Sequence, residues 1–183
     1  QKSQMGGGSP NIRGFEANKV LLVLDGVRLN NAIYRSGHLQ NIITIDEYMI
    51  EDIEIIFGPS SVLYGSDALG GTIHMKTIDV YFFEKPRWSG GIFSSYNSAY
   101  SGYKNNFTFK FESKKYSTAT SVSFKRFGDV EMGSWRPHGY ADWGLVHHYV
   151  DDNNEVVCNP NPEIQKNVGY TQYDLFNKMV FKI

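Results

Sequence analysis

The second half of the chain alternates aromatic and polar residues, and this pattern constrains the fold more than any other feature. Between Asn105 and Glu112, phenylalanine takes every second position from Phe107 onward, and polar residues fill the positions between. Successive side chains of a β-strand point to opposite faces, so this segment predicts a strand with one aromatic and one polar face. The same alternation predicts further strands at 88–96, 116–124 and 173–183.

The connections between these predicted strands differ greatly in length. Residues 113–115 allow only a tight turn, whereas residues 128–169 form a long polar segment. Outer-membrane β-barrels combine short periplasmic turns with longer extracellular loops, and the chain fits that scheme. A soluble antiparallel sheet with one buried face gives the same alternation. The pattern therefore leaves both architectures open, and in the barrel reading 128–169 is a long extracellular loop.

The composition changes near residue 80. Of the 27 aromatic residues (3 Trp, 12 Tyr and 12 Phe), five precede residue 80, and the first part is instead rich in Gly, Ile, Leu and Val. We place a domain boundary at 78–86. The prediction is a first domain over 1–79, followed over 80–183 by about four antiparallel strands with the 128–169 loop between the last two.

The first part reads as mixed α/β. Short β-branched and apolar runs predict strands at 19–24, 53–57 and 72–76. Asp25-Gly26 predicts a tight hairpin turn, because glycine tolerates positive φ. Gly58-Pro59 predicts a strand that gives way to a short helix over 60–63, since proline is tolerated at the first helical position. The polar segment 30–41 predicts a loop.

Charge and composition exclude several classes of protein. The formal net charge of -1 argues against a nucleic-acid partner, which a basic face would serve. Cys158 is the single cysteine, so no internal disulfide is expected. No catalytic constellation stands out, and we expect neither an enzyme nor a bound cofactor or metal. The acidic residues Glu47, Glu51, Asp52 and Glu54 are expected to form a solvated face.

Four segments of the first part occur together in a characteristic order. They are Gly7–Phe15 (GGSPNIRGF), Val20–Arg28 (VLLVLDGVR), Ile53–Gly65 (IEIIFGPSSVLYG) and Ala68–Ile73 (ALGGTI). The ordered set covers nearly all of residues 6–77 and closely resembles the plug domain of TonB-dependent outer-membrane receptors. The resemblance implies a plug domain followed by the first strands of a transmembrane β-barrel that continues beyond this chain.

What the resemblance implies for function is energy-coupled uptake of a scarce ligand through the outer membrane of a Gram-negative bacterium. The implied partners are TonB, which binds a segment expected before Gln1, outer-membrane lipid, and a small iron-containing ligand or a haem protein. The stretch Tyr34–Asn41 (YRSGHLQN) resembles the haem and haemoglobin receptor branch.

The resemblance also assigns roles to individual residues. Arg13 corresponds to an arginine of an ion-pair lock between plug and barrel wall; the usual second lock arginine is replaced here by Phe57. Outward plug loops at 16–19 and 34–40 would touch the ligand. The candidate ligand contacts are Glu16, Asn18, Tyr34, Arg35, His38 and Gln40, and the expected structural turn glycines are Gly26, Gly58, Gly65, Gly70 and Gly71.

Two alternatives stand beside this hypothesis. A glycan or peptide importer of the same family would share every plug motif. A soluble secreted β-rich module could bind carbohydrate by stacking sugars on Trp135, Tyr140 and Trp143. That reading explains the aromatic residues of the long loop, but it leaves the ordered plug segments without an explanation.

Overall fold

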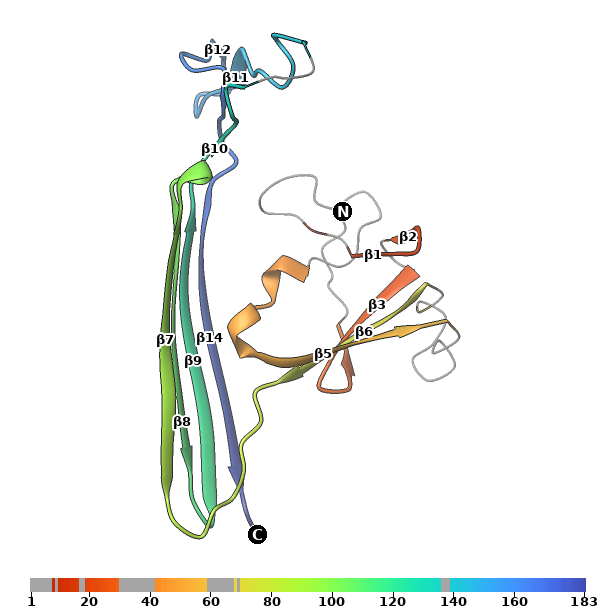
Figure 1. The fold of residues 1–183 in the computed structure, drawn as a ribbon, viewed down its shortest axis with the longest axis vertical. Coiled ribbons are helices and arrows are strands. Elements are labelled where there is room, and N and C mark those ends of the chain that lie inside the picture. Colours follow the sequence, from red (N-terminus) through yellow and green to blue (C-terminus); the bar gives the residue numbers. More distant parts are fainter. Residues whose placement is uncertain are drawn as a thin grey trace.

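The chain folds into two four-stranded sheets and a loop module, shown in Figure 1. The computed structural model describes residues 8, 10–16, 19–29, 42–58, 68, 70–135 and 139–183. We call the N-terminal four-stranded sheet the mixed sheet and the C-terminal four-stranded sheet the long sheet. Within the described residues, no helix has the length and hydropathy needed to cross a membrane.

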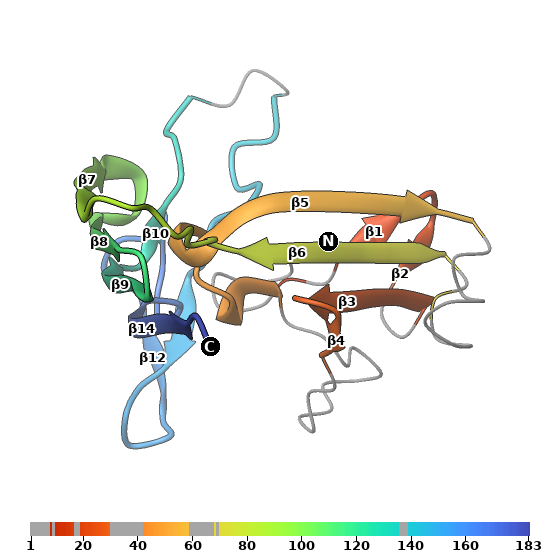
Figure 2. The same ribbon diagram turned by 90° about the horizontal axis from the view of Figure 1, so that it is seen from below.

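The mixed sheet has the strand order β4-β3-β6-β5. Its strands are β3 (Val20–Leu24), β4 (Val27–Arg28), β5 (Ile50–Phe57) and β6 (Gly71–Thr77). Strand β6 pairs in parallel with β3 and antiparallel with β5, so two segments far apart in sequence become neighbours. Figure 2 shows β3, β6 and β5 side by side. A separate hairpin, β1 (Asn11–Ile12) and β2 (Phe15–Glu16), lies beside it.

The core of the N-terminal part lies on both faces of β3. Val20, Leu21, Leu22 and Val23 are all buried, as expected for a continuous apolar run in a strand covered on both sides. Val20 and Leu22 pack with Ile12, Ile73 and Met75, whereas Leu21 and Val23 pack on the other face with Ala68.

Turn chemistry fixes the ends of this sheet. Asp25 and Gly26 have φ values of 46° and 83°, the pair of positive angles that a two-residue hairpin requires. The Asp25 carboxylate accepts hydrogen bonds from the Thr77 backbone N–H at 2.8 Å and from its hydroxyl at 2.5 Å. At Gly70, a Cβ would lie 2.3 Å from the Phe15 Cβ, so no larger residue fits between β2 and β6 without a shift.

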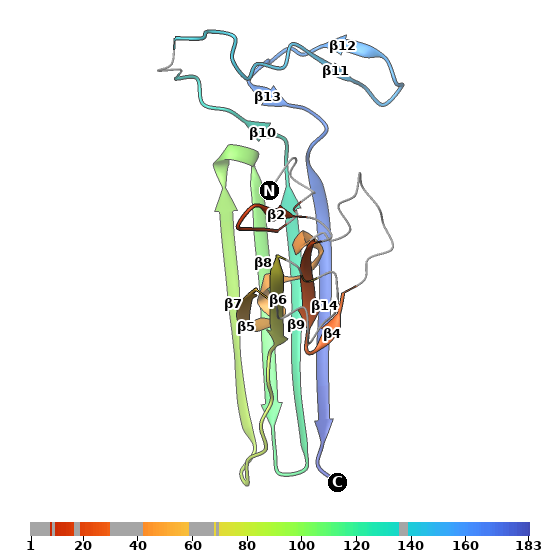
Figure 3. The same cartoon turned by 90° about the vertical axis from the view of Figure 1, so that its right-hand side faces the viewer.

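The long sheet is an antiparallel meander with the order β14-β9-β8-β7. Its strands are β7 (Arg87–Asn97), β8 (Gly102–Glu112), β9 (Tyr116–Phe127) and β14 (Tyr170–Phe181). A 3-10 turn, η5 (Ser98–Tyr100), joins β7 to β8, and residues 113–115 join β8 to β9 at the opposite end. In Figure 3 the mixed sheet lies in front of the long sheet, partway along it.

The two faces of the long sheet have opposite chemistry. The face toward the mixed sheet carries small and polar residues, among them the buried Ser117, Ser121, Ser123 and Lys125. The other face carries exposed apolar residues. One row runs across all four strands in register, and its members are 81% (Ile92), 50% (Phe107), 45% (Val122) and 77% (Leu175) exposed.

The segment between β9 and β14 is an ordered module at the end of the long sheet. It contains two small ladders, β10 (Val130–Glu131) with β13 (Ile164–Gln165) and β11 (His148–Val150) with β12 (Val156–Cys158). The buried Asn159 joins them, because its side-chain amide donates to the Val146 and Ile164 carbonyls, each at 2.8 Å.

The strand predictions are confirmed. Each predicted strand is present, usually one to three residues longer, and the long 128–169 connection falls between Phe127 and Tyr170 as expected. The helix expected at 60–63 and the loop expected at 30–41 lie outside the described residues.

Candidate functional site: the contact between the two sheets

The two sheets meet where one turn of the mixed-sheet unit reaches the polar face of the long sheet. This turn is the 3-10 helix η3 (Glu47–Met49), which directly precedes β5. Asp46 is its N-cap: it has an extended backbone, and its carboxylate accepts from the Tyr48 N–H at 3.4 Å. The cap points two consecutive carboxylates, Asp46 and Glu47, at the long sheet.

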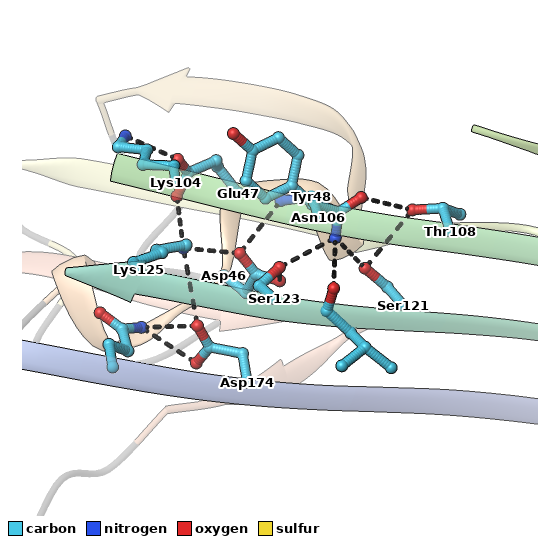
Figure 4. A network of polar contacts seen from close by, with 12 residues as sticks. Asp46, Glu47, Tyr48, Lys104, Asn106, Thr108, Ser121, Ser123, Lys125 and Asp174 are labelled. Atoms are coloured by element: carbon cyan, nitrogen blue, oxygen red, sulfur yellow. Dashed lines mark hydrogen bonds and ion pairs between the residues drawn. The ribbon is translucent and has the colours of Figure 1, made fainter. Parts of the chain in front are cut away.

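Both carboxylates form ion pairs with a buried lysine, Lys125. The Lys125 ammonium lies 2.6 Å from Asp46, 2.8 Å from Glu47 and 3.6 Å from Asp174. Ser123 donates to the second Asp46 oxygen at 2.6 Å, and Lys104 donates to Glu47 at 2.9 Å. Figure 4 shows these residues converging from η3 and from strands β8, β9 and β14. We call Asp46, Glu47, Lys104, Ser123, Lys125 and Asp174 the Lys125 cluster.

Glu47 compensates the repulsion between two like charges in the long sheet. Lys104 and Lys125 are direct cross-strand partners on the same face. Like charges in that arrangement destabilise a strand pair. Glu47 places one carboxylate oxygen on each ammonium, so the charge of the mixed-sheet unit compensates a repulsion built into the long sheet.

The depth of the cluster makes its pairing obligatory. The side chains of Lys125 and Asp46 are only 3% and 2% exposed. Buried charges demand partners, because removing one partner of a buried pair costs about 3–5 kcal/mol while the intact pair adds little net stability. The cluster therefore specifies where the two sheets meet more than it strengthens the fold.

The ionisation of Glu47 follows from the same contacts. Partial burial by itself raises the pKa of the Glu47 carboxyl, but the hydrogen bonds from Lys125 and Lys104 and the Lys125 charge outweigh it and lower that pKa to about 2. Glu47 is therefore a carboxylate at neutral pH, and the ion pairs persist there.

Neutral contacts extend the cluster along the long sheet. The buried Asn106 amide donates to the hydroxyls of Ser121 and Ser123, both at 2.8 Å, which satisfies the polar row beneath η3. The ring of Tyr48 packs against Phe93 of β7, with 5.2 Å between the ring centroids. The turn η3 thus touches β7, β8 and β9 together.

A second set of contacts ties the segment after β6 to the other end of the long sheet. Lys178 donates to the Asp79 carboxylate at 2.9 Å, and Lys110 donates to the Asp79 carbonyl at 3.1 Å. Further along, the Tyr81 backbone donates to Glu112 and accepts from Ser117, at 2.8 and 2.6 Å. The N-terminal unit is held at two separate places.

Arg13 lies in the turn between β1 and β2. Its guanidinium carbon lies 4.7 Å from the centroid of the Phe57 ring, a cation–π contact. The residue that replaces the expected second arginine therefore serves as a stacking surface for the first one.

The other residues singled out from the sequence divide into three groups. Asn18, Tyr34, Arg35, His38, Gln40 and Gly65 lie outside the described residues, and Glu16 is placed in β2 by its backbone alone. Gly26, Gly58 and Gly71 have positive φ values of 83°, 80° and 143°. Gly70 lies in the close contact with Phe15 described above. No group of three or more metal-ligating side chains occurs among the residues that the structure describes.

The expectation of a solvated face at Glu47 holds in part: its side chain is 50% exposed, but it also pairs with Lys104 and Lys125. The neighbouring acids Asp52 and Glu54 are also exposed. The Lys76 ammonium lies 3.6 Å from Asp52 and 2.5 Å from Glu54. Sequence reasoning missed Asp46, Lys104, Lys125 and Asp174 as site residues. One usable signal was that Lys125 continues the Ser117–Ser123 positions, on the face opposite Val122 and Phe124.

Comparisons with known proteins decide the family. Residues 1–72 match the family model described as TonB-dependent Receptor Plug Domain. Residues 1–72 are thus a TonB-dependent receptor plug domain. The expected fold class, a plug domain followed by antiparallel strands, is thereby confirmed.

Individual relatives extend the match beyond the plug. The vitamin B12 transporter BtuB of Vibrio vulnificus is 30% identical over 163 residues, covering 81% of this chain and 24% of that protein. The hemin receptor of Yersinia pestis is 38% identical over 91 residues, or 50% of this chain and 13% of the receptor. The heme/hemopexin utilization protein C of Haemophilus influenzae is 46% identical over 68 residues, which cover 37% of this chain and 9% of that protein. The chain thus spans about a quarter or less of these relatives.

Proposed function

We propose that the chain is the plug and the first wall strands of a TonB-dependent transporter in the outer membrane of a Gram-negative bacterium. It takes up a scarce ligand and makes or breaks no covalent bond. The observation that carries the proposal is the Lys125 cluster, which seats the plug on the wall through ion pairs and hydrogen bonds. Polar contacts of this kind can be exchanged for water when the plug moves, which a permanently packed apolar interface resists.

The faces of the long sheet support the membrane part of the proposal. The exposed row Ile92–Phe107–Val122–Leu175 is unfavourable in water and favourable in lipid. The loop 128–169 then lies outside the cell, and the turn at 113–115 faces the periplasm. Strand β5 presents Ile53, Ile55 and Phe57, each about half exposed. Further wall strands would cover them.

The ligand we propose is haem, haemoglobin or another iron compound. The names of two relatives that match the plug part at 38% and 46% identity support haem. We assign ligand contact to Tyr34, Arg35, His38 and Gln40, together with Glu16 and Asn18. Cobalamin is the second candidate, favoured by the name of the relative that matches over 163 residues. TonB is the proposed energy-coupling partner, and Arg13 is proposed to pair with a wall carboxylate.

The test is uptake by the full-length receptor that contains this chain, expressed in a Gram-negative strain without haem receptors of its own. We expect growth on haemin as the iron source, abolished when the host lacks TonB. His38→Ala and Tyr34→Ala should weaken haemin binding to the purified receptor about tenfold or more, the effect of losing one good contact. Lys114→Ala, at the opposite end of the long sheet, should leave it unchanged. Binding of cyanocobalamin without haemin would select the second candidate; binding of neither would discard both.

A further inference from the structure

The Lys125 cluster lies directly beneath the loop 128–169. Lys125 is two residues before Phe127, where β9 ends and the loop begins. Asp174 is four residues after Tyr170, where the loop ends and β14 begins. Both side chains turn toward the mixed sheet, where Lys125 pairs with Asp46 and Glu47, and Asp174 pairs with Lys125. The two strands that carry the loop therefore both contribute to the seat of the plug.

The base of the loop is itself tightly connected to these two strands. Asp129 accepts hydrogen bonds from the Val168 and Gly169 backbone N–H groups, at 3.2 and 3.4 Å. The rings of Phe127 and Tyr170 stack with centroids 4.5 Å apart. A displacement of the loop thus passes into the ends of β9 and β14 as one unit, and on the face toward the mixed sheet the first charged side chains below that base belong to the cluster.

Below the base, the contacts are of a kind that responds to small displacements. Lys125 is buried and shared among three carboxylates, one of which, Asp174, lies at the longer distance of 3.6 Å. Gln172, the cross-strand partner of Lys125, donates from its amide nitrogen to both Asp174 oxygens at 2.9 Å. A change in the spacing of β9 and β14 therefore redistributes Lys125 between the wall carboxylate and the two plug carboxylates.

We propose that Lys125 couples the loop 128–169 to the plug: an event at the loop changes how firmly η3 is seated, and the seating of η3 changes the order of the loop base. Lys125 is a positioning residue that acts through Asp46 and Glu47. The inference rests on the proposed function in one respect: the coupling would transmit ligand binding outside the cell to the plug. The coupling itself is reciprocal and can be measured without a ligand.

The long sheet supplies a matched control. Lys178 of β14 is a second lysine on the face that carries Lys125 of β9, and it holds the plug through Thr77 and Asp79 rather than through η3. It lies near the end of β14 away from the loop. Lys178→Met therefore removes a contact between plug and wall, a more exposed one, without touching the strand ends that carry the loop.

The experiment is hydrogen exchange by mass spectrometry on the full-length receptor in detergent. Lys125→Met should raise the rate of amide exchange both at 46–50 and at the loop base, residues 128–132 and 166–170. We expect an increase of about fivefold or more, which corresponds to the lower end of typical coupling energies between two sites. Lys178→Met should raise exchange only near 77–83. Asp129→Asn, which loosens the loop base, should in turn raise exchange at 46–50, a response that a purely local role for Lys125 does not produce.

Two results would overturn the proposal. One is faster exchange at 46–50 in Lys125→Met with an unchanged loop base; the other is an equal response of the loop base to Lys178→Met. If Lys125→Met fails to fold, Asp174→Asn replaces it: Lys125 then shifts toward Asp46 and Glu47, so exchange should rise at the loop base and fall at 46–50, and unchanged exchange at 46–50 would overturn the proposal. Failure of wild-type receptor to bind haemin would refute the proposed ligand while leaving these exchange results intact.

Discussion

The mixed sheet and the long sheet distribute apolar residues in opposite ways. In the mixed sheet, β3 is apolar at every position and buried on both faces, as in a water-soluble domain. In the long sheet most buried side chains are small or polar, among them three serines and Lys125, whereas Trp88, Ile92 and Leu175 are 70%, 81% and 77% exposed. Under the proposed function, the difference means that the two sheets face different solvents, with a polar boundary between them.

The largest contrast should come from truncating the same residue type in the two sheets. Leu22→Ala leaves a cavity in the core of the plug and should cost about 2–5 kcal/mol of its stability. Leu175→Ala, on the exposed face, leaves none and should cost less than about 1 kcal/mol. Hydrogen exchange of the β3 amides in the full-length receptor reports the first loss. Equal costs at the two positions would contradict the assignment of different solvents.

A charge on the exposed face sharpens the comparison. Leu175→Arg lies midway along β14 and should destabilise the receptor in a lipid bilayer by about 2–4 kcal/mol, whereas Thr171→Arg, on the same face near the loop, should cost about 0–1 kcal/mol. Urea titration of folding into lipid vesicles measures both. Should the two variants behave alike, the face does not meet the hydrocarbon layer, and the soluble-sheet alternative regains support.

The smallest effect concerns the polar boundary itself and its response to pH. The pKa of Glu47 is about 2 in the folded protein against a usual value of 4.5, so its contribution is complete above pH 4.5 and is lost as the pH falls toward 2. The effect is modest because the Glu47 side chain is half exposed.

Spin labels on exposed plug and wall positions should report a broadened distance distribution between pH 4.5 and 2. In Glu47→Gln the distribution should already be broad at neutral pH, because Lys104 and Lys125 then face each other without a carboxylate between them. A pH-independent distance distribution in the wild type would show that Glu47 does not hold the two sheets together.

Local sequence patterns predicted the strands because the information is local. The alternation around Phe107 and the run at Val20–Val23 indicate which strand faces are apolar. The Asp25-Gly26 pair predicts the hairpin turn that it forms. The plug motifs predicted the family for the same reason. The Lys125 cluster was not predictable, because Glu47 and Lys125 are 78 positions apart and their meeting depends on the register of three strands and on the placement of η3.

The parallel pairing of β3 with β6 has a consequence for the order in which the chain acquires structure. Val20 pairs with Gly71, 51 positions later, whereas β8 and β9 are joined by a tight turn. Loop closure over such a span slows pairing, while neighbouring hairpins form quickly. Strand β3, the most apolar segment of the plug, must therefore wait for β6 before it is covered. Until β6 arrives, this segment is an exposed apolar strand that can associate with other apolar chains.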